Sequence, residues 1–207
     1  MSSSARQFTF GGMGLDGRHR KQVKHFDIRA DVRELTFSCF GRRPLLTNDT
    51  WRTLLSQSID RALARHDYRL AAFVYMPEHV HLIVWPESDA APMQAVLRAI
   101  KRPVSYRIKQ QLVERRSALL KKLTIQQRLG VTVFRFWQEG PGYDRNLTSG
   151  DALLQAIDYV HQNPTRRRLS GRAEDWPWSS ARWFRDPEGA VDSPLPRLPR
   201  LPPHVFD

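Results

Sequence analysis

The first clear pattern of apolar and polar positions spans residues 33–40. Apolar side chains take every second position there, at Leu35, Phe37 and Cys39, and they alternate with Thr36 and Ser38. Successive side chains of a strand point to opposite faces of its sheet. The alternation therefore predicts a strand with one buried face and one polar face.

A helix is predicted over residues 49–66. Its apolar residues recur at helical spacing: Trp51, Leu54, Leu55, Ala62 and Leu63. Thr47 or Asn48 precedes it and can act as the N-cap, because a short polar side chain accepts a hydrogen bond from the first free backbone N–H groups.

Three more strands are predicted further along the chain. Residues 69–76 and 79–85 are rich in apolar and aromatic side chains, and residues 77–78 (Pro-Glu) form a tight connection between them. Residues 131–137 are the fourth strand candidate. Residues 139–146, which contain two glycines, are expected to form a loop.

Two further helices are expected. One lies in the basic stretch 93–129, where Pro103 should break or kink it. The other begins at a motif that resembles a capping box, formed by Thr148 and Asp151, and ends at residues 163–164, Asn-Pro.

The resulting order, β-α-β-β-α-β-α, predicts a ferredoxin-like α+β fold, an antiparallel sheet with helices packed on it and the basic helical stretch 93–129 inserted. We expect one folded domain over residues 33–185. Residues 1–32 are expected to form a basic flexible arm. Residues 186–207 hold six of the 14 prolines and are expected to form a tail that does not fold by itself.

The net charge of the chain indicates the class of partner that it binds. The 207 residues include 33 Lys and Arg against 21 Asp and Glu, a formal charge of +12. An excess of this size favours a nucleic-acid partner over a merely solvated basic surface, since it recurs in several segments.

The single cysteine, Cys39, excludes an internal disulfide and a zinc site built from several cysteines. The polar start of the chain is not followed by a signal-peptide-like apolar run, and no stretch approaches the length of a membrane span. We therefore expect a cytoplasmic, nucleoid-associated protein with no membrane partner. The sequence is compatible with either a monomer or a homodimer.

His79 and His81 are the first candidates for chemistry. Two residues apart in a predicted strand, they should project from the same face, opposite Val80 and Leu82. Neighbouring imidazoles suit a pair of metal ligands. The motif alone leaves open the alternative of two hydrogen-bonded structural histidines.

Tyr159 and Asn163 are the second pair of candidates. The helix that carries them has its apolar stripe at Leu153, Leu154, Ile157 and Val160. At about 100° per residue, Tyr159 and Asn163 lie close together and off that stripe. This placement suits a nucleophile beside a metal ligand, although a surface tyrosine and an asparagine that ends the helix would look the same.

Several motifs in this order resemble the HUH single-tyrosine transposases, and most closely the branch of REP-associated tyrosine transposases. They are residues 35–39 (LTFSC), 77–82 (PEHVHL), 136–138 (FWQ), 143–146 (YDRN), 158–164 (DYVHQNP) and 175–180 (DWPWSS). The likeness extends over residues 33–185, so it implies that this segment is a catalytic domain.

The resemblance implies metal-dependent nicking and rejoining of single-stranded DNA through a 5′-phosphotyrosine intermediate. Tyr159 would be the nucleophile, while His79, His81 and Asn163 would hold Mg²⁺ or Mn²⁺. The substrates of the family are hairpins with a nearby cleavage site, so single-stranded or hairpin DNA is the expected partner.

Eight basic residues are candidates for DNA contacts: Arg98, Lys101, Arg102, Arg107, Arg145, Arg166, Arg167 and Arg168. A solvated surface is the alternative for each group of them. Tyr106 and Tyr143 are other possible nucleophiles, but neither has an amide one helical turn later in the right context. Trp176 and Trp178 are expected to pack rather than to stack on bases.

Two other functions compete with this interpretation. A relative that binds hairpin DNA or RNA without cutting it would keep the same fold. A metal-free phosphodiesterase would need paired histidines each followed two residues later by Ser or Thr, a motif that this sequence lacks.

Overall fold

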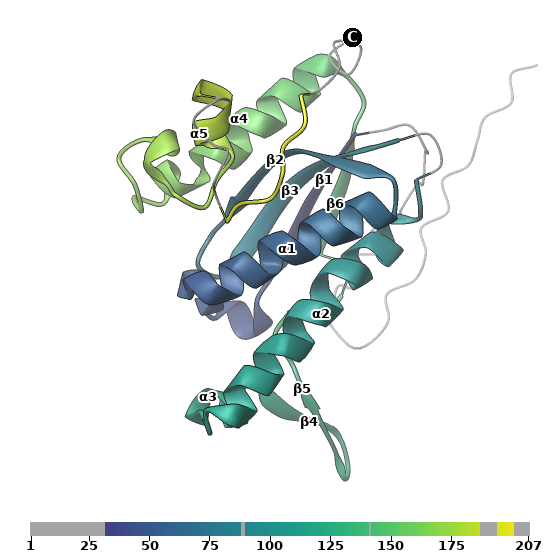
Figure 1. Ribbon diagram of the computed structural model, residues 1–207, viewed down its shortest axis with the longest axis vertical. Helices are drawn as coiled ribbons and strands as arrows, with labels where there is room; N and C mark the ends of the chain where they lie inside the picture. The colour runs from purple at the N-terminus through teal and green to yellow at the C-terminus, as the bar shows by residue number, and fades with distance from the viewer. Residues whose placement is uncertain (1–31, 88–89, 141, 187–193, 201–207) are drawn as a thin grey trace, which may run out of the picture.

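The computed structural model describes residues 32–87, 90–140, 142–186 and 194–200. Four antiparallel strands form its central sheet: β1 (Val32–Ser38), β2 (Tyr68–Tyr75), β3 (His79–Pro86) and β6 (Tyr143–Leu147). Their order, β2-β3-β1-β6, places the first and third strands in the centre. This is the predicted ferredoxin-like α+β arrangement (Figure 1).

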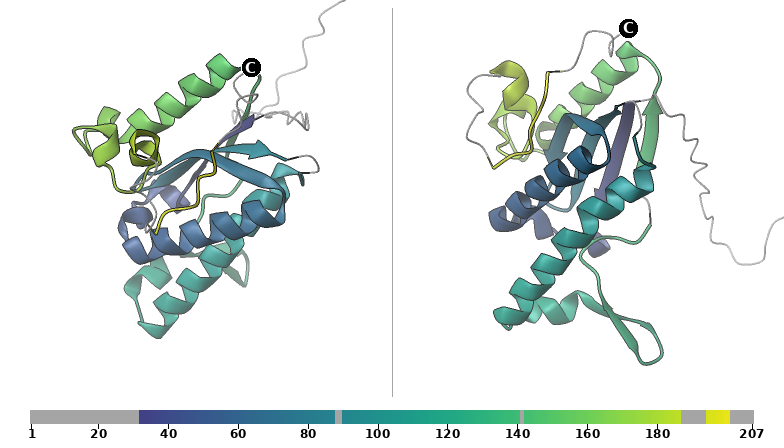
Figure 2. Two further views of the ribbon diagram at one scale, coloured as in Figure 1. Left: turned by 45° about the horizontal axis from the view of Figure 1, so that its top comes forward. Right: turned by 45° about the vertical axis from the view of Figure 1, so that its right-hand side comes forward.

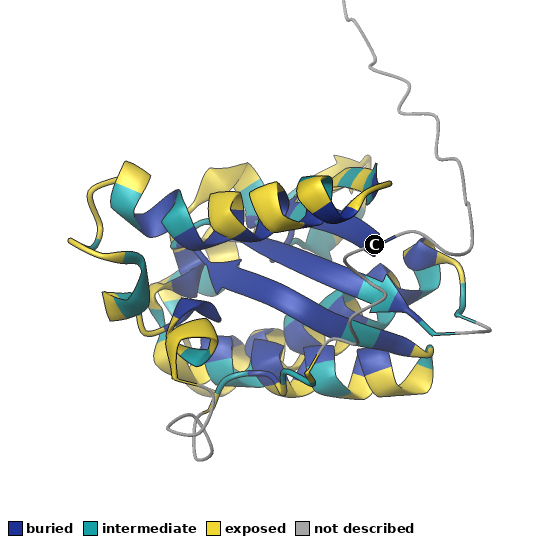
Figure 3. Cartoon of the chain, turned by 90° about the horizontal axis from the view of Figure 1, so that it is seen from above, coloured by how far each residue is buried: buried dark blue, intermediate teal, exposed yellow. Residues whose placement is uncertain are grey.

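Helices cover both faces of the sheet. Helices α1 (Asp49–Arg65) and α2 (Met93–Glu114) lie on one face, and α4 (Gly150–Arg166) lies on the other (Figure 2). Viewed from above, the strands form a buried layer between helices whose outer sides are exposed (Figure 3). The chain thus has two cores, one on each side of the sheet.

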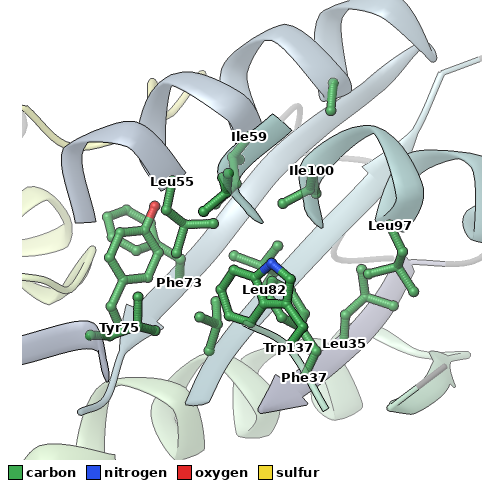
Figure 4. Packing of buried hydrophobic residues seen from close by; sticks show 14 of the residues in the cluster. Leu35, Phe37, Leu55, Ile59, Phe73, Tyr75, Leu82, Leu97, Ile100 and Trp137 are labelled. Atoms are coloured by element: carbon green, nitrogen blue, oxygen red, sulfur yellow. The ribbon is translucent and has the colours of Figure 1, made fainter. Parts of the chain in front are cut away.

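The larger core lies beneath α1 and α2. Leu55 and Ile59 of α1 and Ile100 of α2 are fully buried against the strands (Figure 4). The predicted alternation of β1 is confirmed, since Leu35 and Phe37 belong to this core while Thr36 faces the other way. Asn48 is the N-cap of α1, and its side chain accepts a hydrogen bond from the backbone N–H of Trp51.

The fourth strand of the sheet is not the segment that the sequence indicated. Within residues 131–137, the strand β5 (Val131–Phe134) pairs with β4 (Thr124–Arg128) in a separate two-stranded ribbon. The predicted loop 139–146 instead contains most of β6. Its polar composition hid it, because β6 is an edge strand whose Asp144 pairs with the buried Arg33.

The basic stretch 93–129 is not one helical region. Helix α2 ends at Glu114, the short helix α3 (Ala118–Lys122) follows, and β4 takes the remainder. Pro103 does not break α2. Its missing N–H leaves the carbonyl of Ala99 without its usual helical donor. The Ser58 hydroxyl donates to the next carbonyl, of Ile100, at 2.9 Å and lies 3.4 Å from that of Ala99.

Helix α4 also departs from its predicted ends. Ser149, rather than Thr148, caps it through a hydrogen bond from the N–H of Ala152. The helix continues through Pro164 to Arg166, because a proline near a helix end removes only one of the last hydrogen bonds. Leu154, expected on the apolar stripe, is 53% exposed.

A later segment closes the free edge of β2. After the 3-10 turn Ala173–Asp175 (η3), the backbone of Trp178 accepts from the N–H of Tyr75, and Ser180 bonds to Phe73. Trp178 is buried and stacks on Tyr75, which confirms its predicted packing role. The end of the edge from Phe73 to Tyr75 is therefore not open to pairing with another chain.

The remaining short elements are the 3-10 turns Phe40–Arg42 (η1) and Leu45–Thr47 (η2) and the helix α5 (Ala181–Arg185). Of the predicted tail, residues 194–200 lie along α1, where the backbone N–H of Arg197 donates to Asp60. Apart from Val32, the predicted N-terminal arm lies outside the described residues. In the described part of the chain, no helix is long and apolar enough to cross a membrane.

Candidate active site

His79 and His81 lie on the face of β3 that is covered by α4. Val80 and Leu82 point into the opposite core, as the alternation predicted. Both imidazoles are buried, and their Nε2 atoms are 3.0 Å apart. Their ring planes are nearly perpendicular, with 4.8 Å between the centroids.

The outer nitrogens of both rings have fixed partners. Nδ1 of His81 is 2.8 Å from the hydroxyl of Thr36, which is directly opposite on β1. Nδ1 of His79 is 3.1 Å from a carboxylate oxygen of Glu78, which also pairs with Arg167. A carboxylate accepts the Nδ1–H of His79, so the lone pair of that ring lies on Nε2.

Burial keeps both imidazoles neutral. It lowers the pKa of His81 to about 3, with a smaller contribution from His79. The pKa of His79 is also lowered by burial, although Glu78 opposes the change. Partial burial favours the protonated form of Glu78, but Arg167 and His79 outweigh it and lower the pKa of that carboxyl.

These features fit a divalent metal. Metal-bound histidines usually hold their second nitrogen on a carboxylate, a hydroxyl or a carbonyl, and both rings here do so. Two ligand atoms at right angles on an ion, each about 2.1 Å from it, would be separated by about 3.0 Å, the spacing of the two Nε2 atoms. Neutral imidazoles also leave the full charge of an ion available to a phosphate.

No three His, Cys, Asp or Glu side chains gather into a metal site among the residues that the structure describes. A third protein ligand would therefore be of another type. Asn163 is buried on α4, and its Nδ2 donates to the carbonyl of Tyr159 at 2.8 Å. With its nitrogen used in this way, Asn163 has its amide oxygen left for a ligand.

Tyr159 stands beside the histidine pair. Its ring is nearly perpendicular to that of His81, with 5.8 Å between the centroids, and the side chain is 42% exposed. The guanidinium of Arg166 lies 5.0 Å above the Tyr159 ring. A surface cavity of about 570 Å³ is lined by Tyr159, Arg145 and Arg166 together with residues of α4.

The other side of α4 is fixed to the sheet. His161 is buried, its Nε2 is 2.7 Å from the hydroxyl of Ser180, and its ring contacts that of Phe184. Burial lowers the pKa of His161 to about 4, so this imidazole is neutral as well. The contact holds α4 against the segment that closes β2, and so fixes the helix that carries Tyr159.

The eight predicted DNA-binding residues fall into two groups. Four lie around the histidine side of the sheet: Arg145, which pairs with Glu34, Arg166 over Tyr159, Arg167 on Glu78, and the exposed Arg168. The other four are on α2, on the far side of the sheet. Arg98, Arg102 and Arg107 are exposed there, whereas the ammonium of Lys101 lies over the core ring of Phe37.

Sequence reasoning missed the roles of two residues of this site, Thr36 and Glu78, and named Tyr143 only as another possible nucleophile. Thr36 and Glu78 hold the histidines, and Tyr143 on β6 lies directly opposite Thr36. Thr36 was recognised only as part of a polar strand face. The register of β1 against β3 and β6 brings these side chains together, and a strand pattern carries no information on its partner's register.

Comparison with known proteins shows the family to which this chain belongs. The family described as "Transposase IS200 like" matches residues 33–163, which is 131 of the 207 residues. The chain therefore belongs to the IS200-like transposase family, which confirms the resemblance found in its sequence. The comparison with curated protein sequences gave no match.

A solved structure shares the fold. It is described as "Structure of the REP associates tyrosine transposase bound to a REP hairpin", and it is similar to this chain with a TM-score of 0.62 at 16% identity. The match covers 89% of this chain and 95% of the other. At this identity the likeness supports the fold alone.

Proposed function

We infer that this protein nicks and rejoins single-stranded DNA, with Tyr159 as nucleophile and with Mg²⁺ or Mn²⁺ held by His79, His81 and Asn163. The observation that carries the proposal is the position of Tyr159, whose exposed ring lies against His81 at the edge of a buried, neutral histidine pair. Membership of a transposase family supports the same reaction class.

The reaction needs an attacking oxygen, a bound phosphate and a stable leaving group. The Oη–P bond to Tyr159 forms as the P–O3′ bond breaks, and the departing 3′ oxygen takes up a proton. A bound Mg²⁺ or Mn²⁺ would offset the charge of the phosphate and orient it for in-line attack. The phosphotyrosine keeps the energy of the broken bond for rejoining, which hydrolysis would lose.

The protein's own groups explain the geometry of the attack. Arg166 stacks over the ring of Tyr159 and places a positive charge beside the proposed nucleophile, where it can attract a phosphodiester. Arg145 lines the same cavity. Thr36 and Glu78 fix the two imidazoles in one orientation, so that their Nε2 atoms face each other without reorganisation.

The proposed DNA partner is a hairpin with a single-stranded flank. The structural relative was solved bound to a REP hairpin. This chain has a net charge of +12, which attracts a phosphate backbone, and it has arginines on both sides of the sheet. A stem and its flank would have two separate basic surfaces to contact.

The test is a denaturing-gel assay for a covalent protein–DNA adduct with Mn²⁺. The substrates are hairpin oligonucleotides with unpaired flanks, taken from the sequence next to the gene and labelled at one end. A label at the 3′ end should appear on the protein, while a label at the 5′ end should appear on a shortened strand that ends in a 3′-OH.

Tyr159→Phe should form no adduct, and Tyr143→Phe is the matched control that should still form one. An adduct that survives Tyr159→Phe but not Tyr143→Phe would move the nucleophile to β6. If wild type binds these hairpins and never forms an adduct, the protein is a hairpin-binding relative that does not cut.

A further inference from the structure

The positive charge of the chain is concentrated between residues 93 and 138. This segment has eleven Lys and Arg and a single acidic residue, Glu114, a net of +10 out of the +12 of the whole chain. It comprises α2, α3 and the ribbon of β4 and β5. The remainder of the protein is close to neutral, so any long-range attraction of a polyanion is directed to this segment.

The ribbon extends away from the body of the protein beside α3 (Figures 1 and 2). Its base is fixed by the bond from the N–H of Arg135 to the carbonyl of Leu123 and by partly buried Phe134. Five polar side chains along it are exposed: Thr124, Gln126, Gln127, Arg128 and Thr132. Gln126 and Thr132 are direct cross-strand partners.

An apolar residue stands at the tip of the ribbon. Leu129 and Gly130 form the two-residue turn, and Leu129 is 94% exposed. Gly130 supplies the positive φ of this turn, at +73°, so Leu129 is sterically allowed at the first position, but its side chain gains no packing there. The leucine packs on little of the protein itself, so its side chain is free to contact a partner of the ribbon.

The ribbon begins at the end of the sheet where the histidine pair lies. After β5, Trp137 forms a bridge with Cys39, and the N–H of Gln138 donates to the carbonyl of Ser38. Ser38 is the cross-strand partner of His79. DNA bound at the histidines would therefore have its continuation within reach of the ribbon.

We propose that the β4–β5 ribbon enters the major groove of a DNA hairpin stem and reads base edges there. A two-stranded ribbon fits the width of that groove. Arginine pairs with guanine through two hydrogen bonds and glutamine does so with adenine, so Arg128 and Gln126 are the residues suited to read sequence. Leu129 at the tip provides an apolar contact for a thymine methyl group.

Basic residues beside the ribbon suit the phosphates that border a groove. They are the exposed Arg115, Arg116, Lys121 and Lys122, around α3. Contacts of this kind position a protein on the duplex and carry no sequence information. The ribbon would thus read the bases, and the basic residues around α3 would position the protein on the duplex. A substitution in the ribbon can therefore test base reading separately from phosphate binding.

The inference rests on the proposed function, because it takes hairpin DNA as the substrate. The experiment therefore measures stem recognition and nicking separately. Wild type is used to select stems from a pool of DNA hairpins with randomised stems and one constant unpaired flank. Arg128→Lys keeps the charge and loses the paired hydrogen bonds. Arg65→Lys, at an exposed position on α1, is the matched control.

Wild type and Arg65→Lys should select the same stems, with guanine at one fixed position. Arg128→Lys should lose that preference and bind the selected stem on the order of tenfold more weakly. Its affinity for an unrelated stem should be unchanged. Selection of the same stems by Arg128→Lys and by Gln126→Ala, at wild-type affinity, would overturn the inference.

Adduct formation on the unpaired flank alone reports on the proposed function. If wild type forms that adduct and shows no preference among stems, the ribbon has no reading role, while the nicking activity stands. If stems are selected in a manner that depends on Arg128 and no adduct forms, the ribbon inference stands, while the nicking activity is refuted.

Discussion

The rings of His81 and Tyr159 meet at 85° with 5.8 Å between their centroids, although one lies on β3 and the other on α4. One partner is buried and neutral, and the other is open to solvent. The pair thus joins the proposed metal-binding surface to an accessible tyrosine, the proposed nucleophile. Any ligand atom bound at the histidines would be close to the side chain of Tyr159.

The first prediction concerns His81 itself. His81→Ala should reduce adduct formation by more than about 10³-fold, because a catalytic metal contributes several kcal/mol to the transition state. Binding of hairpin DNA should be largely unchanged, since the imidazole faces the site rather than the core that holds the fold. Gel-shift and adduct assays on the same preparation measure both. Adduct formation at the wild-type rate in Mg²⁺ would remove His81 from the site.

The second prediction concerns the hydroxyl that orients His81. Thr36→Val keeps the shape of the side chain and removes the 2.8 Å hydrogen bond to Nδ1. The affinity for Mn²⁺ should fall about tenfold, as it does when a partner behind a metal-bound histidine is lost. Calorimetric titration of Mn²⁺ into the protein without DNA measures this directly. Thr36→Ser should restore the affinity, and equal affinities for all three proteins would refute the role.

The third prediction concerns Gly142, at the start of β6. Its φ is +81°, and a Cβ at this position would overlap the carbonyl oxygen of Thr36. Gly142→Ala therefore combines backbone strain with a clash against a central strand, and it should lower the free energy of unfolding by about 2–4 kcal/mol.

Gly130 provides the matched control for that substitution. Its φ of +73° is similar, but a Cβ there would meet nothing within 4 Å. Gly130→Ala should therefore show only the conformational cost of about 1 kcal/mol. Urea unfolding of both variants separates the two contributions, and equal losses would mean that the close approach to Thr36 is unimportant.

The sequence predicted those parts of the fold whose signals are local. The alternation in β1, the cap of α1 and the shared face of His79 and His81 each depend on a few neighbouring residues, and each is present. The strand β6 was missed because Asp144 is buried by an ion pair with Arg33, a partner 111 residues away. No local pattern distinguishes a buried, paired aspartate from one in a loop.

The candidate site shows the same contrast between local and long-range signals. Spacing within one element and the family resemblance indicated four of its residues: His79, His81, Tyr159 and Asn163. Thr36 and Glu78 were missed because their roles depend on strand register and on a turn. Before Pro103, the Ser58 hydroxyl of another helix meets the α2 carbonyls of Ala99 and Ile100 at 3.4 and 2.9 Å. Long-range partners explain each of these differences.

The last prediction concerns Lys101, whose ammonium lies 4.9 Å from the centre of the Phe37 ring. Burial lowers the pKa of this group to about 8 in the folded protein, whereas an unfolded chain has a lysine pKa of about 10.4. Below pH 8 both states are protonated, and the folded state carries the full cost of the buried charge. Between pH 8 and about 10.4 the folded state releases its proton while the unfolded state keeps it, so stability gains with rising pH.

Lys101→Met has similar length and no charge. It should raise the free energy of unfolding at pH 7 by as much as about 3 kcal/mol, and this advantage over wild type should shrink as the pH rises from 8 to about 10.4. Urea unfolding of both proteins across this range measures the difference, in which other titrating groups cancel. A difference that does not vary with pH would show that the ammonium stays hydrated. Lys101 would then be available for the phosphate contact that its place among the basic residues of α2 first suggested.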